Sequence, residues 1–181
     1  MRKVLLGILL LFLSVHTPAR AQDPILDSAI RQSLATFVHQ VPGAREFLAK
    51  TEGYLVIPSL YKAGFFVGGQ YGKGGLFVKT PDGTFRLAEY YELYSASLGL
   101  QFGAQKRSLI VAFLTKEALR KFRSKRSWKV GVNGSVTLID IGTNVDLSTV
   151  EFDKSIVAIA YNNRGLMAGI SLDGSVFKRL Y

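Results

Sequence analysis

Glycines interrupt a strand-like stretch of the chain, Lys62-Ala-Gly-Phe-Phe-Val-Gly-Gly-Gln-Tyr-Gly-Lys-Gly-Gly-Leu-Phe-Val-Lys79, and five of them fall between Gly68 and Gly75. Glycine weakens a strand unless its missing side chain makes room for a bulge, a bend, or a backbone or ligand that comes close. The stretch therefore predicts a strand that another part of the molecule approaches closely.

Apolar segments around this stretch predict further strands. Residues 108–114 and 156–161 are apolar on both alternating faces, which is typical of central strands covered on both sides. The last segments, 165–172 and 175–180, predict a terminal hairpin with its turn at Asp173-Gly174. Shorter strands are expected at 54–58, 63–70, 75–80 and 84–88, with a turn at 81–83, and 90–105 also favours strand.

Three helices are expected, two before the strands and one among them. Asp23-Pro24 is a good start for the first, which extends to Val41, because aspartate caps a helix and proline is tolerated in its first turn. The second is expected over 44–52, and the third follows a cap at Thr115. The predicted fold is α+β: a twisted, mostly antiparallel sheet that can curl toward a barrel, with two N-terminal helices and one inserted helix.

The first 21 residues predict a signal peptide. A basic start, Met1-Arg2-Lys3, precedes an apolar run over 4–15, and Ala19-Arg20-Ala21 is a small-x-small cleavage pattern. The run is shorter than the roughly 20 residues that span a bilayer, so we expect cleavage and not an anchor. The prediction is therefore an exported protein, periplasmic or secreted or peripheral on the envelope membrane, with a single domain over 22–181.

The chain is basic and has no cysteine. Its formal charge is +10, and removing residues 1–21 takes away three cations and no acid, which leaves +7. The lack of cysteine excludes disulfides and a lipid-modified cysteine. A basic surface can attract nucleic acid, an anionic membrane or an acidic partner, and export makes nucleic acid the least expected of these.

Cations concentrate on and after the third predicted helix, where Ala118, Leu119 and Phe122 form a narrow apolar side. Such a run is often only a solvated helix face. Near an anionic bilayer, however, each cation can contribute about 1 kcal/mol of attraction. Trp128 lies among them and would fit either a membrane interface or the core. We interpret seven residues as a candidate lipid-binding patch: Lys116, Arg120, Lys121, Arg123, Lys125, Arg126 and Lys129.

Catalytic and cofactor motifs are weak. His39, the one histidine within 22–181, has no cysteine or acidic cluster at metal-ligand spacing. Glu89 and Glu92 are close in sequence, but no evident partner would raise the pKa of one and leave the other ionised, as a general acid and base pair requires. Gly72-Lys73 lacks the spacing and the following Ser or Thr of a phosphate-binding loop. The sequence thus predicts no catalytic residue, no metal site and no cofactor.

Several motifs in one order resemble the SYLF domain, also called the Ysc-type lipid-binding domain. They are Val56-Ile57-Pro58, Lys62-Ala63-Gly64-Phe65 and the glycine run through Gly75, then the stretch 98–122, and finally Asn163-Arg-Gly-Leu-Met-Ala-Gly-Ile-Ser-Leu-Asp-Gly-Ser175. The resemblance covers roughly 29–181. It implies a lipid-binding module, which in eukaryotic members recognises phosphoinositides and in some cases binds actin filaments, whereas bacterial relatives are exported.

One departure from the family pattern directs the functional hypothesis. The resemblance associates lipid binding with a basic N-terminal helix, but the helix predicted over 24–41 carries only Arg31 as a cation. We therefore expect a non-catalytic envelope protein that binds anionic phospholipid surfaces peripherally through the patch after Thr115, with phosphatidylglycerol, cardiolipin or lipid A as the target and protein partners unknown. The alternatives are a small outer-membrane β-barrel and a carrier of a small apolar ligand.

Overall fold

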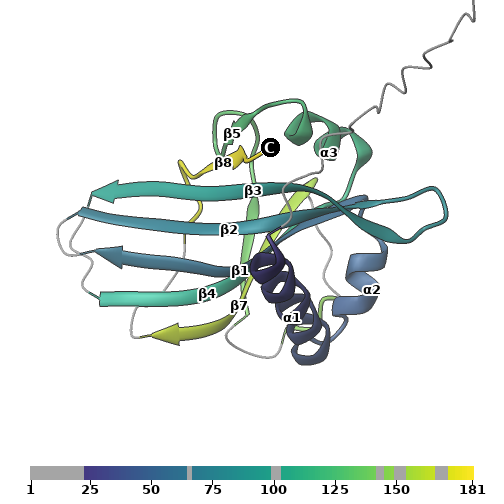
Figure 1. Ribbon diagram of the computed structural model, residues 1–181, viewed down its shortest axis with the longest axis horizontal. Helices are drawn as coiled ribbons and strands as arrows, with labels where there is room; N and C mark the ends of the chain where they lie inside the picture. The colour runs from purple at the N-terminus through teal and green to yellow at the C-terminus, as the bar shows by residue number, and fades with distance from the viewer. Residues whose placement is uncertain (1–22, 65–66, 99–102, 142–144, 149–153, 166–170) are drawn as a thin grey trace, which may run out of the picture.

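A computed structural model describes residues 23–64, 67–98, 103–141, 145–148, 154–165 and 171–181 (Figure 1). Two helices lead the chain and a third lies between strands, as predicted. The helices are α1 (Pro24–Gln40), α2 (Ala44–Ala49) and α3 (Lys116–Arg123). The strands are β1 (Gly53–Gly64), β2 (Val67–Lys79), β3 (Phe85–Leu98), β4 (Gly103–Phe113), β5 (Ser127–Lys129), β6 (Thr137–Asp140), β7 (Ile156–Gly165) and β8 (Val176–Arg179).

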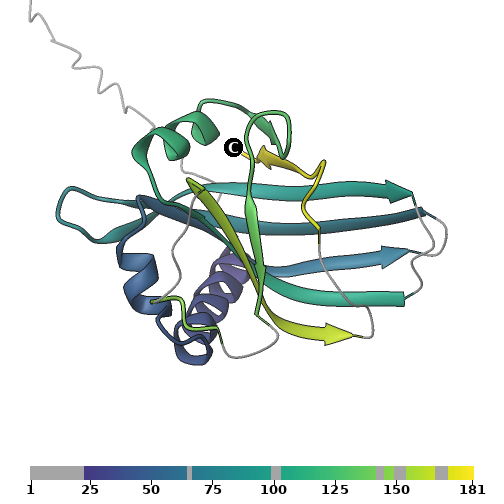
Figure 2. The same cartoon turned by 180° about the vertical axis from the view of Figure 1, so that it is seen from behind.

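All eight strands form one sheet in the order β5-β8-β3-β2-β1-β4-β7-β6. Every pairing is antiparallel except that of β6 with β7, which is parallel. The long strands lie side by side with α1 across one face, while β5, β8 and α3 gather at one edge (Figures 1 and 2). Within the described residues the sheet is an open, curled half-barrel, and the predicted α+β class is confirmed.

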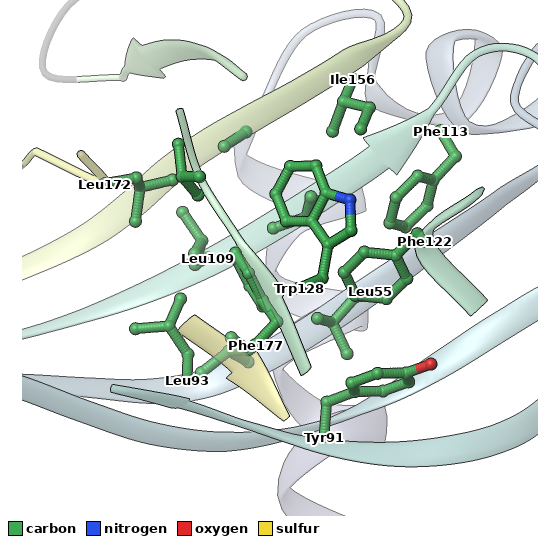
Figure 3. Close-up of a cluster of buried hydrophobic side chains, with 14 of the residues drawn as sticks. Leu55, Tyr91, Leu93, Leu109, Phe113, Phe122, Trp128, Ile156, Leu172 and Phe177 are labelled. Carbon is green, nitrogen blue, oxygen red and sulfur yellow. The ribbon is translucent and has the colours of Figure 1, made fainter. Parts of the chain in front are cut away.

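The sheet separates two hydrophobic clusters. One lies under α1 and α2, where Ile30 and Phe37 are fully buried against Val56, Ile110 and Ile159. The other fills the opposite, concave face and holds a group of aromatic rings (Figure 3). Strands β4 and β7 contribute to both clusters, which confirms that 108–114 and 156–161 are central strands covered on both sides.

Glycines in β2 make room for the backbone of β1. A Cβ atom on Gly74 would lie 2.1 Å from the carbonyl oxygen of Val56, and one on Gly72 would lie 2.7 Å from that of Ser59. The register between β1 and β2 shifts in this same segment, between Val56 and Tyr61. The glycines therefore accommodate a second backbone at a bulge, which confirms the expectation drawn from the glycine-rich stretch.

Several predicted boundaries are wrong because the sheet pairs over longer distances than the local pattern indicates. The strand expected at 63–70 covers the end of β1 and the start of β2, with 65–66 outside the described residues. The second helix ends at Ala49 and not at 52. The helix does not continue because the next residues join the sheet. Glu52 N–H donates to the Phe113 carbonyl at 2.8 Å, and Gly53 already belongs to β1.

The predicted terminal hairpin is also wrong. Of the first expected strand, the described residues 171–172 are not in a strand, and β8 pairs with β3 on one side and β5 on the other, far from β7 in the order of the sheet. The turn itself exists, because Gly174 has a φ of +70° and Ser175 N–H donates to the Leu172 carbonyl at 2.9 Å. Residues 166–170, which belong to this prediction, lie outside the described residues.

The predicted signal peptide over 1–21 lies outside the described residues, so its cleavage stays a prediction. In the part of the chain that the structure describes, no helix combines the length and the apolar character that crossing a bilayer requires.

Substituting Gly74→Ala tests the close approach of β1 and β2. The new methyl group would meet the Val56 carbonyl, so we expect the free energy of unfolding to fall by about 3 kcal/mol. Gly69→Ala in the same strand is the control, because its Cβ would meet nothing nearer than the Ser95 carbonyl at 3.2 Å. Urea denaturation measures both, and equal midpoints for the two variants would contradict the proposed constraint.

Candidate functional site

Helix α3 presents its cations outward because its other side is fixed in the core. Thr115 caps it, with Ala118 N–H donating to Thr115 Oγ1 at 3.2 Å. Phe122 is fully buried, and its ring centroid lies 4.7 Å from that of Phe113 and 4.9 Å from that of Tyr91. The predicted apolar side of the helix is therefore confirmed, and its charged side faces solvent.

Trp128 belongs to the core and not to a membrane-facing surface. It is 2% exposed, and its ring lies 5.6 Å from Phe122 and 6.1 Å from Phe177 (Figure 3). Of the two positions that the sequence left open for this indole, the core is confirmed and the membrane interface is wrong. The ring instead packs β5 against α3 and β8, and so holds the basic segment in place.

Arg123 attaches α3 to the sheet. Its Nη2 and Nε donate to Glu89 Oε1 at 2.7 and 3.1 Å, and the Glu89 side chain is only 10% exposed. Arg179 adds to this contact, since its Nη1 donates to the Arg123 carbonyl at 3.1 Å. Burial raises the pKa of Glu89, but hydrogen bonds from Arg123 and Tyr91 outweigh it and hold that pKa below its usual value. Arg123 therefore has a structural partner.

The other predicted patch residues divide into one paired cation and five without an ion pair. Lys121 Nζ lies 2.8 Å from Glu117 Oε1, but both side chains are more than 60% exposed, so the pair contributes little stability. Among the described residues, the remaining five cations have no carboxylate within ion-pair distance, and all are exposed. They are Lys116 and Arg120 on α3, Lys125 and Arg126 after it, and Lys129 on β5.

A hollow of about 530 Å³ lies between α3 and the neighbouring strands. The cations that line it are Lys79, Lys116, Arg120, Arg123 and Arg179, and its two carboxylates are Glu52 and Glu89. Because Glu89 is already paired with Arg123, the hollow keeps an excess of positive charge. The charge of this lining suits an anionic oxygen group such as a phosphate ester.

Sequence reasoning missed two of these features. Lys79 comes from β2, 37 positions before Lys116, and nothing in the local pattern connects them. The partner of Glu89 was also missed, although an acid among the tyrosines of this strand could have indicated a buried ion pair. Glu92, the other noted acid, pairs with Lys178 Nζ at 3.2 Å.

The structure gathers no metal-binding group in the residues it describes, where no three His, Cys, Asp or Glu side chains come together. His39 is exposed on α1. The absence of a metal, a cofactor and a catalytic residue stays a prediction.

Substituting Glu89→Gln tests the attachment of α3. Because the folded-state pKa of Glu89 is lowered, its contribution to stability is full above the unfolded value near 4.5 and is lost as the pH falls through the lower folded value. At pH 7 we expect a loss on the order of 2 kcal/mol, since the variant leaves Arg123 without its partner.

Urea denaturation at pH 7 and pH 3 measures this contribution. The difference between wild type and Glu89→Gln should shrink at the lower pH. Glu117→Gln, which breaks the exposed pair with Lys121, is the matched control and should leave the free energy of unfolding almost unchanged, because solvent screens this pair. Equal losses for the two variants would show that Glu89 does not anchor the helix.

Comparison with known proteins finds a family model that covers α3 and the basic segment after it. Residues 94–179, which include α3 and β4 to β8, match the family described as Ysc84, Las17-binding protein actin regulator. The chain is 30% identical over 129 residues to SH3 domain-containing YSC84-like protein 1 of Rattus norvegicus, which covers 71% of this chain and 37% of that protein. The Xenopus laevis protein of the same name is 28% identical over 128 residues, covering 71% and 38%.

A fungal protein matches over a longer segment. LAS seventeen-binding protein 3 of Saccharomyces cerevisiae (strain YJM789) is 28% identical over 151 residues, covering 78% of this chain and 33% of that protein. The chain thus spans between 33% and 38% of the length of these curated relatives.

Proposed function

The chain belongs to the Ysc84 family, whose domain is also called SYLF, and from this premise we propose that it is a non-catalytic protein that binds anionic phospholipid surfaces peripherally. The names of its relatives describe binding and regulation and not catalysis. The sequence pattern at its start supports export, with phosphatidylglycerol, cardiolipin or lipid A as the membrane target. Protein partners of this chain are not part of the proposal.

One observation carries the proposal: five exposed cations near α3 have no carboxylate partner in the described structure. Unpaired surface cations attract an anionic leaflet with about 1 kcal/mol each, so together they provide a useful attraction. Two of them, Lys116 and Arg120, also line the hollow beside α3, where a headgroup phosphate would meet both. The attraction falls steeply as salt screens the charges.

Arg123 and Lys121 contribute less to this surface than the sequence alone indicates. Arg123 is committed to Glu89, and Lys121 is paired with Glu117. The binding surface we propose therefore consists of Lys116, Arg120, Lys125, Arg126 and Lys129, with Arg123 holding the helix that carries two of them.

Charge reversal tests this surface. The variant Lys116→Glu, Arg120→Glu, Lys125→Glu should lose binding to vesicles that contain phosphatidylglycerol, because each change replaces attraction by repulsion. Co-sedimentation at low salt measures binding, with phosphatidylcholine vesicles as the neutral reference.

The matched control is Lys50→Glu, Lys73→Glu, Lys106→Glu, which makes the same change in net charge at exposed positions that do not line a hollow with α3. We expect it to keep at least half of the wild-type binding. If both triple variants lose binding equally, net charge and not the surface at α3 is responsible. If the wild type binds neutral and anionic vesicles alike, the proposed function is wrong.

A further inference from the structure

A second hollow lies on the opposite face of the sheet, under α1 and α2, and differs in character from the one beside α3. Its volume is about 480 Å³, within the range of about 300–1,000 Å³ that is usual for small-molecule sites. Leu34 and Val38 of α1 form one wall and Leu48 of α2 another. Strands β1, β2 and β3 supply an aromatic floor of Tyr54, Phe77 and Phe85.

The floor of this hollow is well fixed, whereas its apolar surface is only partly covered. Tyr54 is 5% exposed, its ring stacks on Phe77 at 5.3 Å between centroids, and it contacts Phe85 at 4.9 Å. Burial raises the pKa of Tyr54 to about 12, so its hydroxyl stays neutral. Leu34, Val38, Phe77 and Phe85 are all half-buried. An apolar, preformed hollow with exposed walls is what an apolar ligand group fills favourably.

Two arginines from different helices give the hollow a charge preference. Arg31 of α1 and Arg45 of α2 are exposed and line it, and no Asp or Glu side chain does. Neither arginine forms an ion pair in the described structure, and Asp27, one turn before Arg31, accepts a hydrogen bond from Tyr90 at 2.5 Å. A guanidinium group binds carboxylate with two parallel hydrogen bonds.

A third cation lies close by. Lys79 Nζ is 5.6 Å from the centre of the Phe85 ring and donates to the Ala49 carbonyl at 2.8 Å, and both of these residues line the hollow. Positive charge is therefore found on several sides of an otherwise apolar site. This combination favours a ligand with one apolar chain and one anionic end.

We propose that this hollow binds a single-chain anionic amphiphile, a fatty acid, with its chain on the aromatic floor and its carboxylate between Arg31 and Arg45. The inference goes beyond the proposed attachment to a membrane surface, because it concerns one molecule held by different elements on the other face of the sheet. It does not depend on the cations near α3.

The test uses dodecanoate and its uncharged analogue dodecanol, each measured by competition against a fluorescent fatty acid. The variant Arg31→Gln, Arg45→Gln should bind dodecanoate at least tenfold more weakly, since it removes the charge-assisted hydrogen bonds, and should bind dodecanol within about twofold of wild type. Ala35→Trp should weaken both ligands strongly, because Ala35 is an exposed lining residue whose replacement fills the hollow.

Ser28→Trp is the matched control, an exposed position on α1 that does not line the hollow. It should bind both ligands like wild type. The proposal is overturned if the wild type shows no saturable binding, if Ala35→Trp and Ser28→Trp behave alike, or if the arginine variant weakens both ligands equally. It is also overturned if sedimentation shows a dimer that Ala35→Trp dissociates, because a second copy then occupies the hollow.

The two proposals fail separately. The triple variant of the cations near α3 should keep dodecanoate binding, and Ala35→Trp should keep binding to anionic vesicles. If the wild type binds dodecanoate but does not bind anionic vesicles, the proposed function is wrong and the fatty-acid site is still supported.

Discussion

The contact between the β1 bulge and the glycines Gly72 and Gly74 of β2 sets the geometry of the whole sheet. β1 is hydrogen-bonded to β2 on one side and to β4 on the other, and its register shifts against both in the same segment. Gly72 and Gly74 allow this because a side chain at either position would collide with the β1 backbone. The bulge also decides which side chains face inward, since Leu60 enters the concave core while Tyr61 remains exposed. The positions of the neighbouring strands β3 and β4 therefore depend on the register of β1 and β2.

The basic segment shows why a count of charges is a poor guide to a binding surface. Its cations look equivalent along the chain, but Arg123 is bound to a nearly buried carboxylate and Lys121 to an exposed one. The aromatic contacts of Phe122 and Trp128 then determine where the remaining five point. Structural and candidate functional cations alternate within a few positions, and only the partners of each one separate the two groups.

Most predictions that rest on neighbouring residues succeeded, with the terminal hairpin and the end of the second helix as exceptions, and those that need distant partners did not. The structure confirms the helix caps at Asp23 and Thr115. It also confirms the strands that are buried on both faces and the close approach of a second backbone at the glycines. All of these are local properties of the sequence. The burial of Trp128, the pairing of Glu89 and the placement of β8 depend on side chains tens of residues away. The apolar hollow is a stronger example, because Arg31, Arg45 and Phe85 come together through two helices and three strands that no local pattern places side by side.

The position of β8 has a consequence for the order in which the domain assembles. Phe177, near the end of the chain, lies 5.8 Å from Phe122 and 6.1 Å from Trp128, so the aromatic core on the concave face is incomplete until this strand arrives (Figure 3). β8 also separates β5 from β3, so β5 has no strand to join before β8 is in place. Pairing between segments so far apart in sequence is slow, because the entropy of closing the loop is lost before the stabilising contacts form. A chain emerging from the ribosome would therefore keep the concave face of its sheet open until β8 has been made, and the docking of this strand is the closing step in the folding of the domain.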